Sequence, residues 1–306
     1  MTREPIIGIA LGGGAAKGWA HIGVLEALLE RGVDPQVVSG ASIGALVGAA
    51  LAGGKLPALK AWVLELRRLD VLKLLDASLG SGVIHGNRVM RAIEDILTDR
   101  DIADLDRPFG AVATDLHRGR TVWLREGSTI AAVRASCALP GLIKPVRRDD
   151  AWLLDGGLVD PVPVTLCRML GADIVIAVNL SPYRHRRPRP LPTSEERQPA
   201  DAALHREEVT YIGRLQQYVH GLFEAGESPP EREPALLDVM SSAIDIMQER
   251  VARSRLAGDP PEIEIVPDVQ DIGLMDFHRA ALAVQRGLEA VNNRAEEIAR
   301  LLPLHH

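Results

Sequence analysis

The chain has 306 residues, of which 46% are hydrophobic and 25% are charged, and its formal net charge is −6. These values are typical of a soluble globular protein with an ample core, and they exclude a disordered chain, a collagen-like repeat and a small disulfide-stapled domain. Aromatic side chains are few (3 Phe, 3 Tyr and 4 Trp) and the charge is mildly acidic, so we do not expect nucleic acid as a partner.

Strand and helix patterns alternate at the start of the chain. A strand, a helix, a second strand and a second helix are predicted for residues 5–11, 18–31, 37–40 and 43–51. This order favours parallel strands joined by right-handed crossovers. The loops at 12–18 and 39–44 should therefore emerge side by side at one edge of the sheet.

Part of this region, from Pro35 to Gly54, carries no charge over 20 residues, which is long enough to span a bilayer. We do not expect a membrane helix there, because its apolar content comes mostly from Ala and Val and is interrupted by glycines. The N-terminus is a weak signal-peptide candidate, and Cys137 and Cys167 lie far apart. A reduced, cytoplasmic setting is therefore expected.

The rest of the chain continues the mixed pattern. Helices are predicted for 56–75, 88–97, 128–138, 163–170, 209–222, 236–251 and 276–302. Strands are predicted for 109–114, 120–124, both sides of 147–150, 174–178 and 263–266. The strands at 109–114 and 120–124 should pair across the turn between them.

Composition divides the chain into three parts. Residues 5–183 are predicted to form an α/β core, 184–234 a Pro/Arg-rich connection with one helix, and 235–302 a set of helices and a strand that pack on the core. The arginines clustered between Arg184 and Arg189 suit either a solvated loop or docking to an anionic lipid surface. The helices between 205 and 257 suit a lid, a dimer contact or a packed annex alike.

Residues 40–44, Gly-Ala-Ser-Ile-Gly, match the nucleophile-elbow pattern G-x-S-x-G, and they lie between a strand and a helix as that pattern requires. The turn strains the backbone of Ser42 and projects its hydroxyl, and a side chain at Gly40 or Gly44 would collide with neighbouring backbone. The following helix directs its positive dipole end toward the serine. Ser42 is therefore a candidate nucleophile, although a packing site for a small-residue helix has the same pattern.

A glycine-rich loop, Gly12-Gly13-Gly14-Ala15-Ala16-Lys17-Gly18, leads into a helix at the same predicted sheet edge. Backbone N–H groups in such a loop can stabilise an oxyanion. A phosphate-binding P-loop needs Gly-Lys-Ser/Thr, whereas here Lys17 precedes Gly18, and a dinucleotide fingerprint that starts at Gly12 needs glycine at position 17. The loop therefore favours an oxyanion hole over a phosphate cradle.

The best-placed acid is Asp155, which is followed by Gly156 and Gly157 and preceded by an apolar strand. The two glycines leave its carboxylate reachable from a neighbouring loop. An Asp has an ordinary pKa of about 3.9, so it can act as a base only through geometry and a dry site. A turn-forming Asp-Gly is the plainer interpretation of this motif taken alone.

Together these three motifs resemble the patatin-like phospholipase family, and in particular a bacterial branch of it. The resemblance covers roughly residues 5–180, and it extends to the segments at 113–116, 135–141 and 160–164. It implies a three-layer α/β/α sandwich around a mainly parallel sheet, with a helical C-terminal extension. It also implies a serine acyl hydrolase of lipid or other carboxylic esters.

The resemblance assigns roles by position. It implies Ser42 as the nucleophile, Asp155 as the base and the loop Gly12, Gly13, Gly14 and Ala15 as the oxyanion hole. Supporting motif positions are Lys17, Gly18, Gly40, Gly44, Gly156 and Gly157. Ala15 replaces a glycine of the family motif, and its backbone N–H survives that change.

Two alternatives stay open. Ser42, Asp155 and His278 occur in the order of an α/β-hydrolase triad, although fewer strands precede Ser42 than that fold usually has. A non-catalytic regulatory or interaction protein on the same fold is the other. His21, one turn beyond Lys17, is expected to make a structural hydrogen bond near the oxyanion loop.

No metal and no organic cofactor are expected, because no His/Cys/acid cluster has ligand spacing and a Ser–Asp dyad needs neither. The expected partner is a lipid or ester substrate. Peripheral contact with a membrane surface and a homo-oligomer are both compatible with the sequence. No motif specifies the acyl chain or the head group.

Overall fold

The computed structural model describes residues 3–74, 87–181 and 236–301. The predicted connection, 184–234, lies entirely outside these residues, and with it the arginine cluster at 184–189 and the helix predicted at 209–222. All the elements below belong to a single compact unit.

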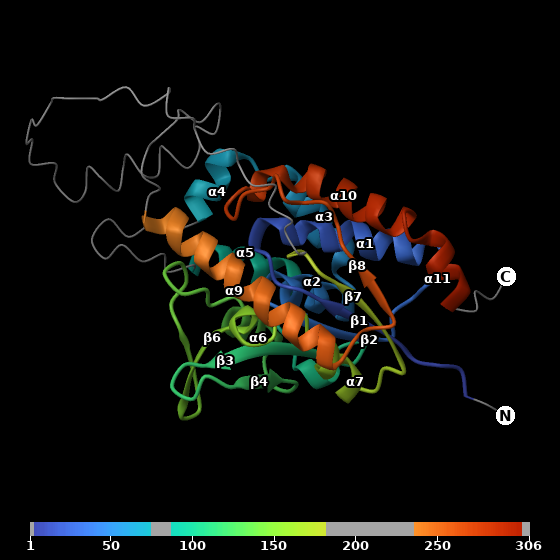
Figure 1. The fold of residues 1–306 in the computed structure, drawn as a ribbon. Coiled ribbons are helices and arrows are strands. Elements are labelled where there is room, and N and C mark those ends of the chain that lie inside the picture. Colours follow the sequence, from blue (N-terminus) through green and yellow to red (C-terminus); the bar gives the residue numbers. More distant parts are fainter. Residues whose placement is uncertain (1–2, 75–86, 182–235, 302–306) are drawn as a thin grey trace, which may run out of the picture. The chain divides into compact units, whose positions relative to one another are not determined.

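The described strands form one mixed sheet (Figure 1). They are β1 Ile7–Leu11, β2 Val37–Ala41, β3 Phe109–Asp115, β4 Thr121–Leu124, β5 Val146–Arg148, β6 Ala151–Asp155, β7 Ile174–Val178 and β8 Ile263–Ile265. Hydrogen-bonded neighbours follow the order β5-β6-β3-β2-β1-β7-β8, and β4 pairs with β3. The strands from β3 through β2, β1 and β7 to β8 are parallel, whereas β4, β5 and β6 join by antiparallel pairing. The predicted pairing of 109–114 with 120–124 is confirmed.

Helices and short 3₁₀ turns follow most of these strands. The α-helices are α1 Ala20–Leu29, α2 Ile43–Ala52, α3 Leu56–Glu65, α4 Arg68–Leu74, α5 Asn87–Leu97, α6 Thr129–Ser136, α7 Val164–Met169, α9 Leu236–Gly258, α10 Ala280–Asn292 and α11 Ala295–Leu301. The 3₁₀ turns are η1 Ala15–Trp19, η2 Ile102–Asp104, η3 Gly156–Leu158 and η5 Phe277–Arg279. Within the described part of the chain, no helix is both long and apolar enough to cross a membrane.

The two faces of the sheet pack against different helices, as alternate residues of β1 show. Ile9 and Leu11 lie in a core with residues of α1, α2, α6 and α10. Ala10, between them, lies in a second core with Cys167 of α7 and Ala252 of α9. Side chains of a strand alternate between its faces, so this pattern places helices on both sides of the sheet. The predicted three-layer α/β/α sandwich is confirmed.

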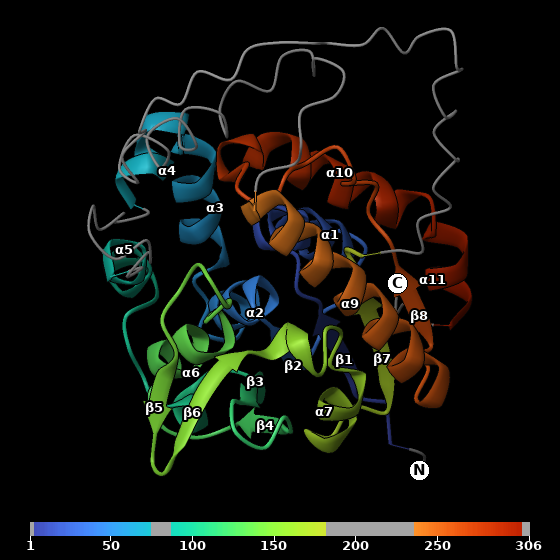
Figure 2. The same ribbon diagram turned by 60° about the vertical axis from the view of Figure 1, so that its left-hand side comes forward.

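The C-terminal segment completes this core. Strand β8 pairs with β7, and α10 packs on α1 with their backbones in close approach (Figures 1 and 2). Gly23 and Gly287 lie at the helix crossing, where a Cβ on either would overlap a backbone carbonyl of the other helix. The absence of both side chains allows this spacing.

Two predicted helices are each divided in the structure. The helix expected at 56–75 breaks between α3 and α4, where Leu66 has extended backbone and Asp70 accepts a hydrogen bond from the N–H of Arg67. The helix expected at 276–302 consists of η5, α10 and α11, and it breaks at Asn293. Periodicity alone cannot detect these ends, because the apolar spacing continues across both breaks.

Candidate active site

Strands β2 and β6 bring Ser42 and Asp155 together. Both strands pair with β3, β2 with residues 109–112 and β6 with residues 113–115. Because β4 pairs with residues 111–114 and so occupies the other edge of β3, β2 and β6 share one edge. One strand is parallel and the other antiparallel to β3, so they run toward each other. Their last residues, Ala41 and Asp155, face adjacent positions of β3.

The backbone at Ser42 is strained in the way that a nucleophile elbow requires. Ser42 has φ 55° and ψ −126°, a conformation that L-residues rarely adopt, directly before α2. A Cβ on Gly40 would overlap the first turn of α2, and one on Gly44 would overlap the carbonyl of Leu11. These overlaps are the collisions with neighbouring backbone that the sequence predicts for a side chain at either glycine.

A further hydrogen bond holds this turn. The backbone N–H of Ser42 donates to Oγ of Ser136, at the end of α6, over 2.8 Å. Ser136 is fully buried. A buried N–H without a partner is costly, so Ser136 stabilises the strained conformation. The segment 135–141 was part of the family resemblance, but the sequence alone suggests no role for this serine.

The hydroxyl of Ser42 donates directly to Oδ2 of Asp155 over 2.5 Å. The other carboxylate oxygen, Oδ1, accepts the N–H of Gly157 over 2.7 Å. Asp155 is completely buried, and burial raises its pKa to about 6, while the hydrogen bonds from Ser42 and Gly157 act in the opposite direction. The carboxylate is therefore ionised at neutral pH and more basic than an exposed Asp.

The glycines after Asp155 allow close packing around this carboxylate. A Cβ on Gly156 would overlap the carbonyl of Val112 in β3. A Cβ on Gly157 would lie 2.5 Å from Nε2 of Gln248 in α9 and 3.0 Å from Oδ1 of Asp155. Helix α9 thus lies against the acid loop, a contact that no local motif indicates.

The glycine-rich loop lies beside Ser42, where a Cβ on Gly13 would be 3.6 Å from the serine Cβ. The N–H groups of Gly12 and Gly13 donate to the carbonyls of Val178 and Pro161. They are therefore not available as oxyanion donors, which corrects the prediction for these two residues. Within the described part of the chain, the N–H groups of Gly14 and Ala15 make no hydrogen bond. Ala15 has φ 47° and begins η1, so the chain turns sharply at these two donors.

The Lys-Gly pair of this loop contacts both α2 and α9. A Cβ on Gly18 would overlap the side chain of Ile43, the residue directly after Ser42. Lys17 is buried, and its Nζ lies 3.3 Å from Oδ2 of Asp245 in α9. Asp245 is 228 positions away in sequence, so this ion pair could not be predicted from the motif.

The two histidines considered from sequence, His21 and His278, have different surroundings. His21 is fully buried, and its Nε2 lies 2.7 Å from the carbonyl oxygen of Gly12, which confirms the expected structural hydrogen bond. Burial lowers the pKa of His21 to about 4, so the ring is neutral and its Nε2–H donates. His278 accepts a hydrogen bond from Nε of Arg68, over 3.1 Å, and makes none to Ser42 or Asp155.

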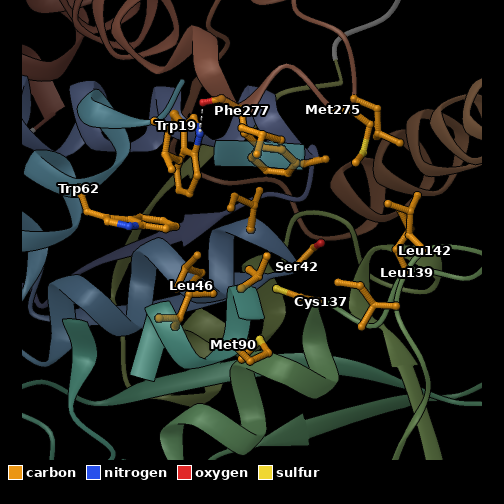
Figure 3. Close-up of a pocket in the computed structure, with 18 residues that line it drawn as sticks. Trp19, Ser42, Leu46, Trp62, Met90, Cys137, Leu139, Leu142, Met275 and Phe277 are labelled. Carbon is orange, nitrogen blue, oxygen red and sulfur yellow. Dashed lines mark hydrogen bonds between the residues drawn. The ribbon is translucent and has the colours of Figure 1, made fainter. Parts of the chain in front are cut away.

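An apolar pocket of about 130 Å³ opens beside Ser42 (Figure 3). Its lining carries no charged side chain and consists of Ala15, Trp19, Ser42, Ile43, Leu46, Trp62, Leu66, Val71, Val89, Met90, Ile93, Cys137, Leu139, Leu142, Ile143, Leu274, Met275 and Phe277. Of this set, the sequence predicts only Ser42 and Ala15 as site residues. The remaining residues come from seven separate segments and share no local signal.

Cys137 lies next to Ser42 in this pocket. Burial is the main cause that raises the pKa of its thiol, and the negative charge of Asp155 acts in the same direction. Cys137 is therefore a neutral thiol and not a competing nucleophile. Among the described residues, no group of three or more His, Cys, Asp or Glu side chains gathers in a way that could hold a metal ion.

Comparisons with known proteins agree with this architecture. A family model described as patatin-like phospholipase matches residues 9–168. An uncharacterized NTE family protein of Mycobacterium bovis is 33% identical over an alignment 349 residues long, gaps included. The alignment covers 97% of this chain and 94% of that protein. Patatin-like phospholipase domain-containing protein 7 of Rattus norvegicus is 32% identical over 182 residues, covering 57% of this chain and 13% of the relative. The crystal structure of VipD from Legionella pneumophila has a TM-score of 0.50 at 14% identity, with coverage of 97% and 67%, which supports the fold alone.

Proposed function

This chain belongs to the patatin-like phospholipase family, and from that premise we propose that it is a serine hydrolase of lipid or other carboxylic esters. Ser42 is the nucleophile and Asp155 is the base. The observation that carries the proposal is the direct hydrogen bond from the Ser42 hydroxyl, which lines an apolar pocket, to the buried Asp155 carboxylate. A hydroxyl held by a base beside an apolar cavity suits attack on an acyl ester.

In the first half of the reaction, Asp155 accepts the proton of Ser42 while the serine oxygen attacks the ester carbonyl carbon. The tetrahedral intermediate then collapses, the bond to the alcohol oxygen breaks, and Asp155 returns the proton to the leaving alcohol. Burial favours the protonated form of Asp155, so the proton transfer from serine is easier than it would be to an exposed Asp.

In the second half, water attacks the acyl-serine and gives its proton to Asp155. The acid product leaves and the proton returns to Ser42. The same carboxylate thus serves as base and acid in both halves, which requires that it stay within hydrogen-bond distance of the serine oxygen. The hydrogen bond from Gly157 to Oδ1 keeps Oδ2 directed at Ser42.

The negative charge on the former carbonyl oxygen needs donors. We assign this role to the N–H groups of Gly14 and Ala15, the two in the glycine loop that have no acceptor among the described residues. The N-terminus of α2, which begins at Ile43, adds a favourable dipole at the same place. Backbone donors need no side chain, so Ala15 serves in the loop as a glycine would.

The test compares hydrolysis of a soluble p-nitrophenyl ester, and labelling by a fluorophosphonate probe, in wild type, Ser42→Ala and Ser254→Ala. Ser254 lies exposed on α9 and outside the pocket, so it controls for loss of a serine. We expect Ser42→Ala to lose labelling and about a thousandfold or more in kcat, as in other serine hydrolases. Hydrolysis that survives Ser42→Ala unchanged would contradict the proposal, and absence of labelling in wild type would favour a non-catalytic protein.

A further inference from the structure

The pocket beside Ser42 has a buried end and an open end. Leu46, Met90 and Ile93, at one end, are all buried. Leu139, Leu142 and Met275 are only partly buried. Figure 3 shows Trp19, Trp62 and Leu46 on one side of Ser42, and Leu139, Leu142 and Met275 on the other side. Ser42 therefore lies between the more buried part of the pocket, here called the chamber, and its more open part.

Aromatic residues form one wall of the pocket. The Trp19 ring meets Trp62 edge-on at 6.5 Å between centroids, and it meets Phe277 in the same manner at 5.9 Å. Nε1 of Trp19 donates to the carbonyl of Phe277 over 3.2 Å, which fixes the orientation of the indole. These rings come from η1, α3 and η5, so three separate elements form one wall of the pocket. A wall held in this way resists displacement by a ligand.

The pocket is also small. Its whole volume, the open end included, is about 130 Å³. An apolar protein cavity of about 150 Å³ holds one benzene molecule, which has about six carbons. The chamber thus accommodates a hydrocarbon chain of about that size and not one of membrane-lipid length.

We propose that the Trp19–Trp62 wall makes this protein specific for esters of short and medium acyl chains, with an upper limit near six to eight carbons. The acyl chain fills the chamber, and the alcohol leaves past Leu139 and Leu142. Trp62 is the main specificity-determining residue, because it lines the pocket from α3 and lies away from Ser42 (Figure 3). This inference rests on the proposed function for the identity of the reacting group, and on the pocket alone for the chain length.

The first experiment measures kcat/KM for p-nitrophenyl esters from acetyl to palmitoyl, each at a concentration where the ester is monomeric. For wild type we expect a maximum near hexanoyl and at least a tenfold fall by decanoyl. For Trp62→Ala, the decanoyl-to-hexanoyl ratio should rise at least tenfold, because each additional methylene that becomes buried is worth roughly fourfold. A wild type that prefers palmitoyl, or a ratio unchanged in Trp62→Ala, would overturn the inference.

Matched variants separate pocket size from folding. Leu64→Ala changes an exposed residue of the same helix that does not line the pocket, so its chain-length profile should equal that of wild type. Trp62→Leu provides a milder enlargement if Trp62→Ala fails to fold, as judged by circular dichroism and thermal unfolding. It should shift the profile in the same direction by a smaller amount.

The second experiment does not depend on hydrolysis. Calorimetric titration of Ser42→Ala with hexanoate and with palmitate tests the chamber directly. We expect hexanoate to bind at least tenfold more tightly than palmitate in this variant, and Trp62→Ala added to it should reverse the preference. If no ester is hydrolysed but this preference holds, the proposed function fails and the chain-length inference stands. If esters are hydrolysed and palmitate binds as well as hexanoate, the inference fails and the function stands.

Discussion

The hydroxyl of Ser42 reaches the carboxylate of Asp155 without any intervening side chain, over 2.5 Å. This contact arises because β2 and β6 run toward each other along one edge of β3 and end at adjacent positions. No imidazole fits between two groups already in hydrogen-bond contact. The geometry therefore favours a Ser–Asp dyad over a triad.

The activity of the dyad should depend on pH through Asp155. Burial raises the pKa of this carboxyl to about 6, and only its ionised form can accept the serine proton. We expect kcat/KM to be constant above about pH 7 and to fall about tenfold for each pH unit below the pKa. A pH–rate profile on a soluble ester measures this directly. A fall centred near pH 4 would show that burial does not control the base.

The same pKa shift predicts a stability difference. The folded pKa of Asp155 lies above the ordinary value of 3.8, so its contribution to stability is present at low pH and is lost as pH rises toward 6. Relative to Asp155→Asn, wild type should lose roughly 2 kcal/mol in its free energy of unfolding between about pH 4 and pH 7. Urea unfolding of both proteins at the two pH values provides the measurement. If wild type and Asp155→Asn differ in free energy of unfolding by the same amount at both pH values, the raised pKa of Asp155 is contradicted.

The elbow glycines should be intolerant of any side chain. A Cβ on Gly44 would overlap the carbonyl of Leu11, which belongs to β1 and cannot move without disturbing the sheet. Gly44→Ala should therefore lower the free energy of unfolding by roughly 1–3 kcal/mol and reduce kcat at least tenfold. Gly258, at the end of α9, has open space around it, so Gly258→Ala is the control and should change neither quantity. Wild-type activity in Gly44→Ala would contradict the steric account.

The ion pair between Lys17 and Asp245 should support catalysis through the oxyanion loop. Asp245→Asn leaves the buried Lys17 ammonium without its counter-charge, so we expect the loop to shift and kcat to fall about tenfold, with KM changed less than twofold.

The pair Glu26–Lys60 provides a matched control. Its acid is as exposed as Asp245, at 28% in both cases, and it lies outside the site. Glu26→Gln should leave kcat and KM as in wild type. Equal kinetic effects of the two substitutions would mean that the Asp245 pair acts on stability alone.

His278 should be dispensable for chemistry. Its Nε2 is occupied by Arg68, and both carboxylate oxygens of Asp155 already accept hydrogen bonds from other groups. His278→Asn should therefore keep kcat within about twofold of wild type, whereas loss of a triad histidine costs several orders of magnitude. Steady-state kinetics on one soluble ester distinguishes the two cases.

Local motifs predicted the parts of the site that depend on local backbone geometry. The strand, the strained turn and the helix around Ser42 occupy neighbouring residues, so Gly40, Ser42 and Gly44 could be assigned their steric roles from the pattern G-x-S-x-G. The alternation of strands and helices likewise determined the sandwich, because parallel strands need helical crossovers. The charge-free stretch from Pro35 to Gly54 proved to be β2 and α2.

Other features depended on contacts between distant segments. The N–H groups of Gly12 and Gly13 donate to the backbone carbonyls of Val178 and Pro161, and only the fold brings these carbonyls to the loop.

The sequence by itself thus determined the fold class and indicated a candidate nucleophile and a candidate acid, because each follows from periodicity or from a short motif. Only the tertiary structure decided which N–H groups are left for an oxyanion, which helix holds Lys17, and how large the chamber beside Ser42 is. Those properties arise from the packing of segments far apart in the chain, and cavity size in particular depends on side chains whose positions no local pattern specifies.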